Sequence, residues 1–79
     1  MTEDQINKGY LLEIAHATRK VPRTIEYFAG QMTQIRGRVD TRALMDVMLD
    51  DGLVECHKDG LDVRRYQITG KGVAAWDAL

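Results

Sequence analysis

Residues 44–72, LMDVMLDDGLVECHKDGLDVRRYQITGKG, decide the fold because their hydrophobic period changes in the middle. Before Gly52 the apolar residues recur at helical spacing, and after it they alternate with polar ones in the runs 53–58 and 61–68. Between these runs stands Asp59-Gly60, the strongest short-range signal for a β-hairpin, because a type I′ turn needs positive φ at both central residues. We therefore expect a helix that ends at Gly52 and an antiparallel hairpin after it.

A two-residue turn at Asp59-Gly60 would fix the pairing register of the hairpin. The expected cross-strand pairs are Lys58 with Leu61, His57 with Asp62, Cys56 with Val63, Glu55 with Arg64, Val54 with Arg65, and Leu53 with Tyr66. Two of these pairs, His57 with Asp62 and Glu55 with Arg64, join a basic to an acidic side chain and support this register. Leu61 and Val63 then form an apolar strip near the tip that could serve hairpin packing, a second copy or another partner, and we favour self-association.

Further helices are expected on both sides of this stretch. The apolar spacing predicts helices over about residues 3–18, 25–32 and 41–51, a short extended piece near Pro22, a loop over 33–39 and a short terminal helix. The expected N-caps are Thr2, Thr24, Asp40 and Thr69. Gly9 within the first helix indicates either a close contact with another helix or a weak spot.

Length and composition indicate one domain, residues 1–79, held together by packing alone. The 79 residues carry a net charge of −1, with 44% hydrophobic and 29% charged residues, which is typical of a globular chain. The single cysteine excludes an internal disulfide. The first twenty residues lack the apolar core of a signal peptide, and the longest uncharged stretch, 27–35, is far shorter than the roughly 20 residues that span a bilayer. We expect a cytoplasmic protein with no membrane partner.

The sequence contains none of the usual signals of an enzyme. It has no glycine-rich phosphate loop, no nucleophile elbow and no His/Cys cluster at metal-ligand spacing. So short a chain also leaves little room for a cleft around an acid/base pair. We therefore predict no catalytic residues, no cofactor and no metal.

Charge alternates in blocks along the chain. Residues 19–38 and 56–72 are net basic, whereas residues 1–18, 39–55 and 73–79 are net acidic. A fold that brought the two basic blocks to one side would build a basic patch from a nearly neutral chain.

The second half of the chain resembles the PadR-like and MarR-like bacterial regulators, which are winged helix-turn-helix proteins. Those families show a leucine-rich helix, acidic residues and Gly-Leu-Val, as in Asp50-Asp51-Gly52-Leu53-Val54. They leave the hairpin through Tyr-x-Leu-Thr-x-x-Gly, which here is Tyr66-Gln67-Ile68-Thr69-Gly70-Lys71-Gly72. Before residue 44 the resemblance rests on element order alone. It implies an α+β fold with a three-helix core, a C-terminal hairpin wing and a short terminal helix.

The resemblance implies sequence-selective binding of double-stranded DNA by a small transcriptional regulator, phage-like in its minimal size. The helix over 41–51 would enter the major groove, with Thr41, Arg42, Met45 and Asp46 at the reading positions. Phosphate contacts would come from Arg23, Thr24, Arg36, Arg38, Lys58, Arg64 and Arg65. A homodimer would read a two-fold symmetric site, with Leu61, Val63, Trp76 and Leu79 as candidate dimer contacts.

One feature of the expected recognition helix opposes this interpretation. Asp46 is a carboxylate without a capping role; it either accepts a hydrogen bond from cytosine N4 or marks a helix that never enters a groove. The alternative is therefore a winged helix that binds another protein and not DNA, with RNA binding as a more distant third. The sequence names neither the target site nor any effector.

Overall fold

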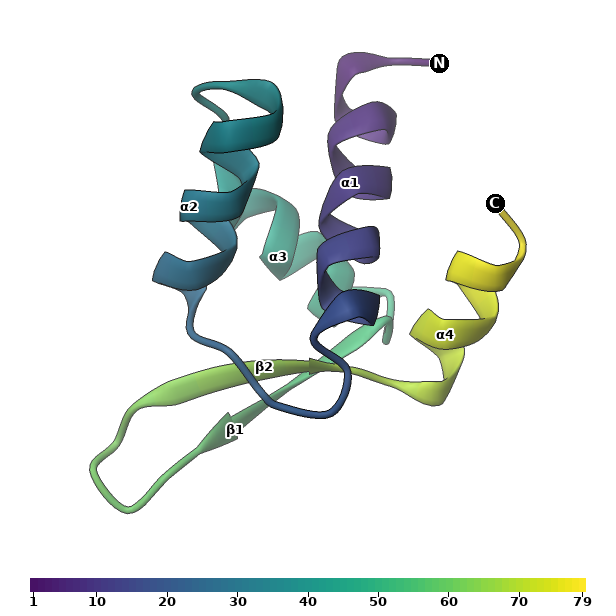
Figure 1. Ribbon diagram of the computed structural model, residues 1–79. Helices are drawn as coiled ribbons and strands as arrows, with labels where there is room; N and C mark the ends of the chain where they lie inside the picture. The colour runs from purple at the N-terminus through teal and green to yellow at the C-terminus, as the bar shows by residue number, and fades with distance from the viewer.

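The computed structural model describes all residues from Met1 to Leu79 and contains four helices and one two-stranded antiparallel sheet (Figure 1). The elements follow in the order α1 (Glu3–Ala17), α2 (Ile25–Arg36), α3 (Thr41–Asp50), β1 (Val54–Lys58), β2 (Arg64–Ile68) and α4 (Gly70–Asp77). This α+β arrangement, with the hairpin after three helices and a short helix at the end, agrees with the order that the sequence predicts. None of the four helices combines the length and the apolar run needed to cross a membrane.

Side-chain caps set the starts of the helices. Thr2 forms the predicted capping box, in which its hydroxyl accepts from Gln5 N at 3.2 Å and Gln5 Oε1 accepts from Thr2 N at 2.8 Å. Asp40 accepts from Ala43 N at 3.1 Å at the start of α3. Thr24 and Thr69 also act as the predicted N-caps, of α2 and α4.

Helix α2 is one turn longer than the sequence predicts. Residues 33–36, predicted to be loop, continue the helix because none of them is a glycine or a proline, and a polar turn can remain helical. The helix stops at Gly37, whose φ of 79° only a glycine adopts without strain. Arg36 therefore lies on a helix and not in a loop, which changes where its side chain points.

The predicted register of the hairpin is wrong. The observed pairs are Val54 with Ile68, Glu55 with Gln67, Cys56 with Tyr66, His57 with Arg65, and Lys58 with Arg64. Residues 59–63 form the loop, and the Asp59 carboxylate organises it by accepting from the backbone N–H of Leu61 at 2.8 Å and of Val63 at 3.1 Å. The positive φ falls on Asp62, at 66°, and not on an Asp-Gly pair. The predicted charge pairs between the strands therefore do not form.

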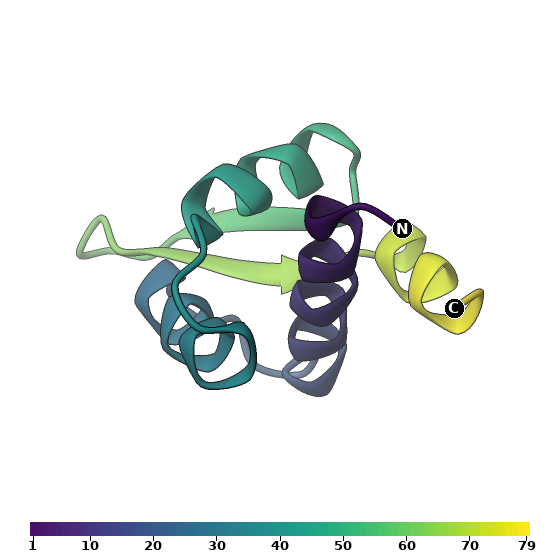
Figure 2. The same cartoon turned by 90° about the horizontal axis from the view of Figure 1, so that it is seen from above.

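The three long helices enclose the core above one face of the sheet (Figure 2). The largest fully buried side chains are Phe28, Leu11, Met32, Met45 and Met48, contributed by α1, α2 and α3. From the hairpin and the turn before it come the buried Leu53, Val54, Tyr66 and Ile68. The core is thus continuous from the helices to the root of the hairpin, whose far end extends beyond it.

Helix α4 packs on its own chain. The Trp76 ring stacks on the His16 ring of α1, with centroids 3.8 Å apart and planes within 2° of parallel. At the other end of α4, a Cβ on Gly72 would lie only 2.1 Å from the carbonyl oxygen of Leu53. Gly9 in α1, by contrast, has no atom near the position of a Cβ, so the close helix contact considered for it does not exist.

The turn between α1 and α2 is bonded to the sheet, as the predicted extended piece near Pro22 requires. Arg23 and Tyr66 exchange two backbone hydrogen bonds, Arg23 N to Tyr66 O at 3.1 Å and Tyr66 N to Arg23 O at 2.7 Å. The Gln67 amide also donates to the carbonyl of Arg19 at 2.9 Å. The start of α2 is thereby held against the free edge of β2.

Candidate nucleic-acid interface

The hairpin presents two cations on the side that faces the helices. Side chains alternate between the two faces of a strand, and Tyr66 points into the core, so Arg64, two residues away, lies on the same face. Lys58 is the cross-strand partner of Arg64 and shares that face. Arg65 and His57 are paired one step along and lie on the outer face.

A hollow of about 230 Å³, here called the hairpin groove, lies between this inner face and the starts of two helices. It is lined by Thr24, Ile25, Glu26, Arg42, Val63, Arg64 and Tyr66. Three residues that the sequence predicts as DNA contacts, Thr24, Arg42 and Arg64, thus come together from α2, α3 and β2. The hairpin projects past the helices on this side of the molecule (Figures 1 and 2).

The charges in the hairpin groove are available to a ligand. Neither Arg42 nor Arg64 is within ion-pair distance of any carboxylate, in contrast to Arg36, Lys58 and Arg65. Burial raises the pKa of the Tyr66 hydroxyl, Cys56 and Asp46 raise it further, and Arg42 and Arg64 oppose the rise. The Tyr66 hydroxyl therefore remains protonated at neutral pH and can donate a hydrogen bond.

Other predicted phosphate contacts are engaged within the chain. Arg36 is the clearest case, because its Nη2 lies 2.8 Å from Glu3 Oε1 and its Nε donates to Asn7 Oδ1 at 2.9 Å. The Arg36 guanidinium also lies over the ring of Tyr10, 5.7 Å from its centroid. The longer α2 turns Arg36 toward α1 in this way, so a phosphate would have to displace Glu3 and Asn7 to contact the Arg36 guanidinium.

The other four cations that the sequence predicts as phosphate contacts differ in the side chains that they contact. Arg23 lies over the ring of Tyr27, 4.8 Å from its centroid, in a second hollow that Arg19 and Lys20 also line. At the hairpin tip, Lys58 Nζ lies 3.0 Å from Asp62 Oδ1 between exposed side chains, so a phosphate can compete for it. Arg65 Nε lies 3.7 Å from Asp59 Oδ2 on the outer face, away from the groove. Arg38 is exposed before α3 without an ion pair.

Two of the four predicted base-reading residues are buried. Thr41 is 4% exposed and Met45 is 0% exposed, so neither reaches a base edge, and their assignment as reading residues is wrong. Arg42 and Asp46, the other two, are exposed on the outer side of α3. The sequence contained the signal for this correction, because Thr41, Met45 and Met48 stand at i, i+4 and i+7 on one helix face. The exposed positions that sequence reasoning missed on α3 are Ala43 and Val47.

The candidate dimer contacts lie at separate places. Leu61 is 86% exposed at the hairpin tip, whereas Val63 is half-buried at the edge of the hairpin groove. Leu79 is 77% exposed beside Met1, where α1 and α4 meet. The ring of Trp76 stacks on the ring of His16 within the same chain. These residues do not form one continuous surface within the chain.

Neither side-chain clusters nor comparisons assign an activity to this site. No three His, Cys, Asp or Glu side chains gather closely enough to hold a metal ion. No family model, curated protein or solved structure matches the chain.

Proposed function

We propose that the protein is a winged helix-turn-helix regulator that binds double-stranded DNA, with α3 in the major groove and the β1–β2 hairpin as the wing. The observation that carries this proposal is the convergence of Thr24, Arg42 and Arg64 from three elements around the hairpin groove. Lys58 extends the same face toward the hairpin tip. A concave surface with cations on two walls fits the curved, charged backbone of a duplex.

The exposed face of α3 supports a specific manner of base recognition. Arg42 stands one turn from Asp46, and both are exposed. An arginine bonds the O6 and N7 of guanine, and an aspartate accepts from the N4 of cytosine, so the pair suits adjacent G·C base pairs. Ala43 and Val47, beside them, offer apolar contacts to a thymine methyl group.

The low net charge favours selective over non-specific binding. Non-specific affinity comes almost entirely from phosphate neutralisation, and the chain carries a net charge of −1 with several of its cations already paired. Two copies bound to half-sites about one helical turn apart would add the affinity that one copy lacks. We therefore include a symmetric site and a homodimer in the proposal.

The experiment is a fluorescence-anisotropy titration with a pool of randomised duplexes at two salt concentrations, followed by sequencing of the bound fraction. Enrichment of a symmetric motif is the expected result. Substitution Arg64→Ala should reduce the slope of log K against log salt by about one, because one phosphate contact is lost. The matched control is Arg65→Ala, the neighbouring arginine on the outer face, which should leave the slope unchanged.

Base recognition needs a separate readout. Substitution Arg42→Ala should relax the preference at one base position, with a loss of about 1–3 kcal/mol there and little loss elsewhere. Equal losses on all sequences would count against α3 in the major groove. Absence of binding even at low salt would reject the DNA proposal altogether.

A second candidate function is the binding of another protein through α3. It is favoured by Val47, which is 47% exposed on a helix whose outer side also carries Asp46 and Asp50. An exposed apolar side chain with two carboxylates on the same side of its helix suits a partner surface that is apolar at its centre and basic around it. This candidate gains if the anisotropy titration shows no DNA binding.

A further inference from the structure

A further hollow, distinct from the two described above, lies on the other side of α3 from Arg42. It has a volume of about 400 Å³ and is bounded by the start of α1, the α2–α3 loop and α3, and we call it the α1–α3 hollow. Its lining residues are Glu3, Asp4, Asn7, Arg36, Arg38, Val39, Asp40, Ala43, Leu44 and Val47. No residue lines both this hollow and the hairpin groove. Its size is within the range of small-molecule sites.

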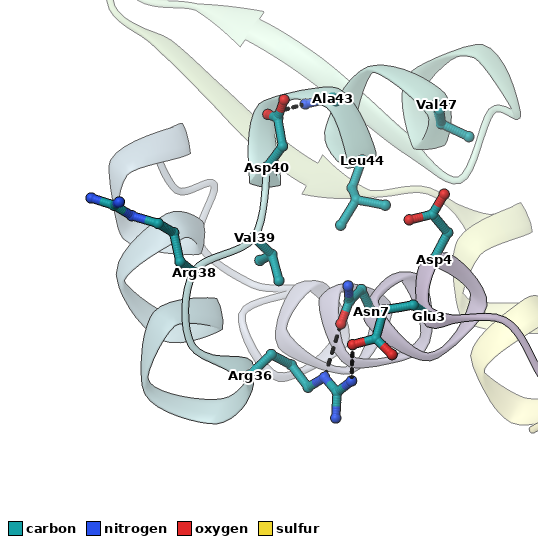
Figure 3. A pocket seen from close by; sticks show the side chains of 10 residues that line it. All are labelled: Glu3, Asp4, Asn7, Arg36, Arg38, Val39, Asp40, Ala43, Leu44 and Val47. Atoms are coloured by element: carbon teal, nitrogen blue, oxygen red, sulfur yellow. Dashed lines mark hydrogen bonds and ion pairs between the residues drawn. The ribbon is translucent and has the colours of Figure 1, made fainter.

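The wall formed by the loop and α3 is apolar. Val39 and Leu44 direct their side chains into the α1–α3 hollow, and Val47 stands further along α3 (Figure 3). Val39 and Leu44 are partly buried against the core, and Val47 is 47% exposed. An aliphatic group placed here would cover apolar surface that the chain leaves uncovered.

The opposite wall holds a buried amide with an unused donor. Asn7 is only 5% exposed, and its Oδ1 accepts from Arg36 Nε at 2.9 Å. An arginine has no acceptor, so this hydrogen bond fixes the amide orientation and turns Nδ2 toward the α1–α3 hollow (Figure 3). Asn7 Nδ2 has no hydrogen-bond partner in the chain, and it is open to the water of the hollow, because the one fully buried side-chain atom without a partner is Thr41 Oγ1. A ligand with an acceptor oxygen would satisfy it.

One carboxylate at the α1–α3 hollow, in the first turn of α1, has no partner side chain. Glu3 is paired with Arg36 at 2.8 Å, and Asp40 caps α3. Arg38 points away from the hollow, whereas the Asp4 carboxylate points toward Leu44 and Val47 (Figure 3). Asp4 has neither an ion pair nor a side-chain hydrogen bond within the chain. The hollow therefore offers an anion, a donor and an apolar wall.

We propose that the α1–α3 hollow binds a small aliphatic amine that also carries a carbonyl oxygen. The aliphatic group packs on Val39, Leu44 and Val47, the ammonium pairs with Asp4, and the carbonyl accepts from Asn7 Nδ2. The residues of this site are separate from those of the hairpin groove, but Ala43 and Val47 also belong to the face of α3 that is proposed above to contact bases.

The test is a titration of the ¹⁵N-labelled protein with leucinamide, followed by amide chemical shifts at about pH 6.5, where an α-amine is protonated. A ligand of this size should bind with a Kd of about 1–10 mM. Saturable shifts should centre on residues 4, 7, 39, 44 and 47. Two probes each lack one group: 4-methylpentanamide lacks the amine and 3-methylbutylamine lacks the carbonyl. Each should bind at least about fivefold more weakly.

Two variants distinguish binding at Asp4 from a general effect of removing a negative charge. Substitution Asp4→Asn should weaken leucinamide binding at least about fivefold, because the anion is lost. The matched control is Asp50→Asn, an exposed carboxylate of α3 outside the α1–α3 hollow, which should leave the affinity unchanged. The spectrum of each variant also reports whether it is folded. Equal binding of the three probes, shifts centred elsewhere, or no saturable shift with leucinamide would each overturn the proposal.

Discussion

Substitution Gly72→Ala should destabilise the protein strongly, although alanine is the better helix former. The added Cβ would lie 2.1 Å from the carbonyl oxygen of Leu53 and 2.6 Å from Cγ1 of Ile68, both far inside contact distance. The Leu53 carbonyl has little freedom to retreat, because it accepts from Thr69 N at 3.0 Å. Helix α4 would therefore have to move away from Leu53, in the turn before β1, and from Ile68 at the end of β2.

The magnitude follows from what that movement breaks. Overpacking costs about 1–3 kcal/mol. Displacing α4 also weakens two hydrogen bonds of Thr69, to Leu53 O at 3.0 Å and to Gly52 O at 2.6 Å, each worth about 0.5–1.5 kcal/mol. Alanine returns about 1 kcal/mol of helix propensity. The net loss is about 3 kcal/mol, a large part of the roughly 4–12 kcal/mol expected of a domain of this size.

Thermal unfolding followed by circular dichroism at 222 nm measures this effect. A domain of this size loses about 4–8 °C of Tm per kcal/mol, so Gly72→Ala should lower Tm by about 12–24 °C. The matched control is Gly9→Ala in α1, where nothing lies within 4 Å of the new Cβ, and it should raise Tm by about 4–8 °C. A Gly72→Ala variant within about 4 °C of the parent protein would refute the close packing of α4 on Leu53 and β2.

Three further predictions concern stability and titration. Thr41 Oγ1 is buried without a hydrogen-bond partner, so Thr41→Val should raise the free energy of unfolding by about 1 kcal/mol in urea titrations, and a loss would show that the hydroxyl is bonded. The hydrogen bond and charge of Lys8, 2.6 Å from Asp51, hold the pKa of that carboxyl below its usual value near 4. A depressed carboxyl pKa stabilises the folded state above a pH of about 4, and this stability is lost as the pH falls through the folded-state pKa. Lys8→Met should therefore make the free energy of unfolding fall less steeply with decreasing pH in this range. An unchanged pH dependence would show that the ion pair with Asp51 does not cause it. Asp59→Ala should speed hydrogen exchange of the loop amides that its carboxylate accepts from, and unchanged protection there would contradict its role in the loop.

Local signals in the sequence predicted most of the fold. Capping residues act through hydrogen bonds within three positions, so Thr2, Thr24, Asp40 and Thr69 could each be recognised without knowledge of the rest of the chain. The prediction of the hairpin register was wrong because the sequence at Asp59 is compatible with two kinds of turn. An Asp-Gly pair favours a tight turn, whereas the Asp59 carboxylate can instead bond the amides of a longer loop. The packing of Tyr66 and Ile68 into the core decides between them, and the local sequence does not contain that information.

The candidate site was predicted less completely than the fold. Residue type indicated that Arg42 and Arg64 could bind an anion, but only the register shows that Arg64 faces the helices and Arg65 faces away. The pairing of Arg36 within the chain could not be predicted because its partners, Glu3 and Asn7, are distant in sequence. The α1–α3 hollow had no signal in the sequence, since it arises from the packing of three segments around Asn7.

The backbone hydrogen bonds between Arg23 and Tyr66 determine how the hairpin groove can behave when it is occupied. They tie the start of α2 to β2, so that two walls of the groove form one rigid frame. A binding surface that is already shaped loses little conformational entropy on association, and more of its contact energy is expressed as affinity. It also discriminates by shape, because it cannot widen to accept a poorly fitting partner. For so small a domain, rigidity of this kind can compensate for a limited number of contacts.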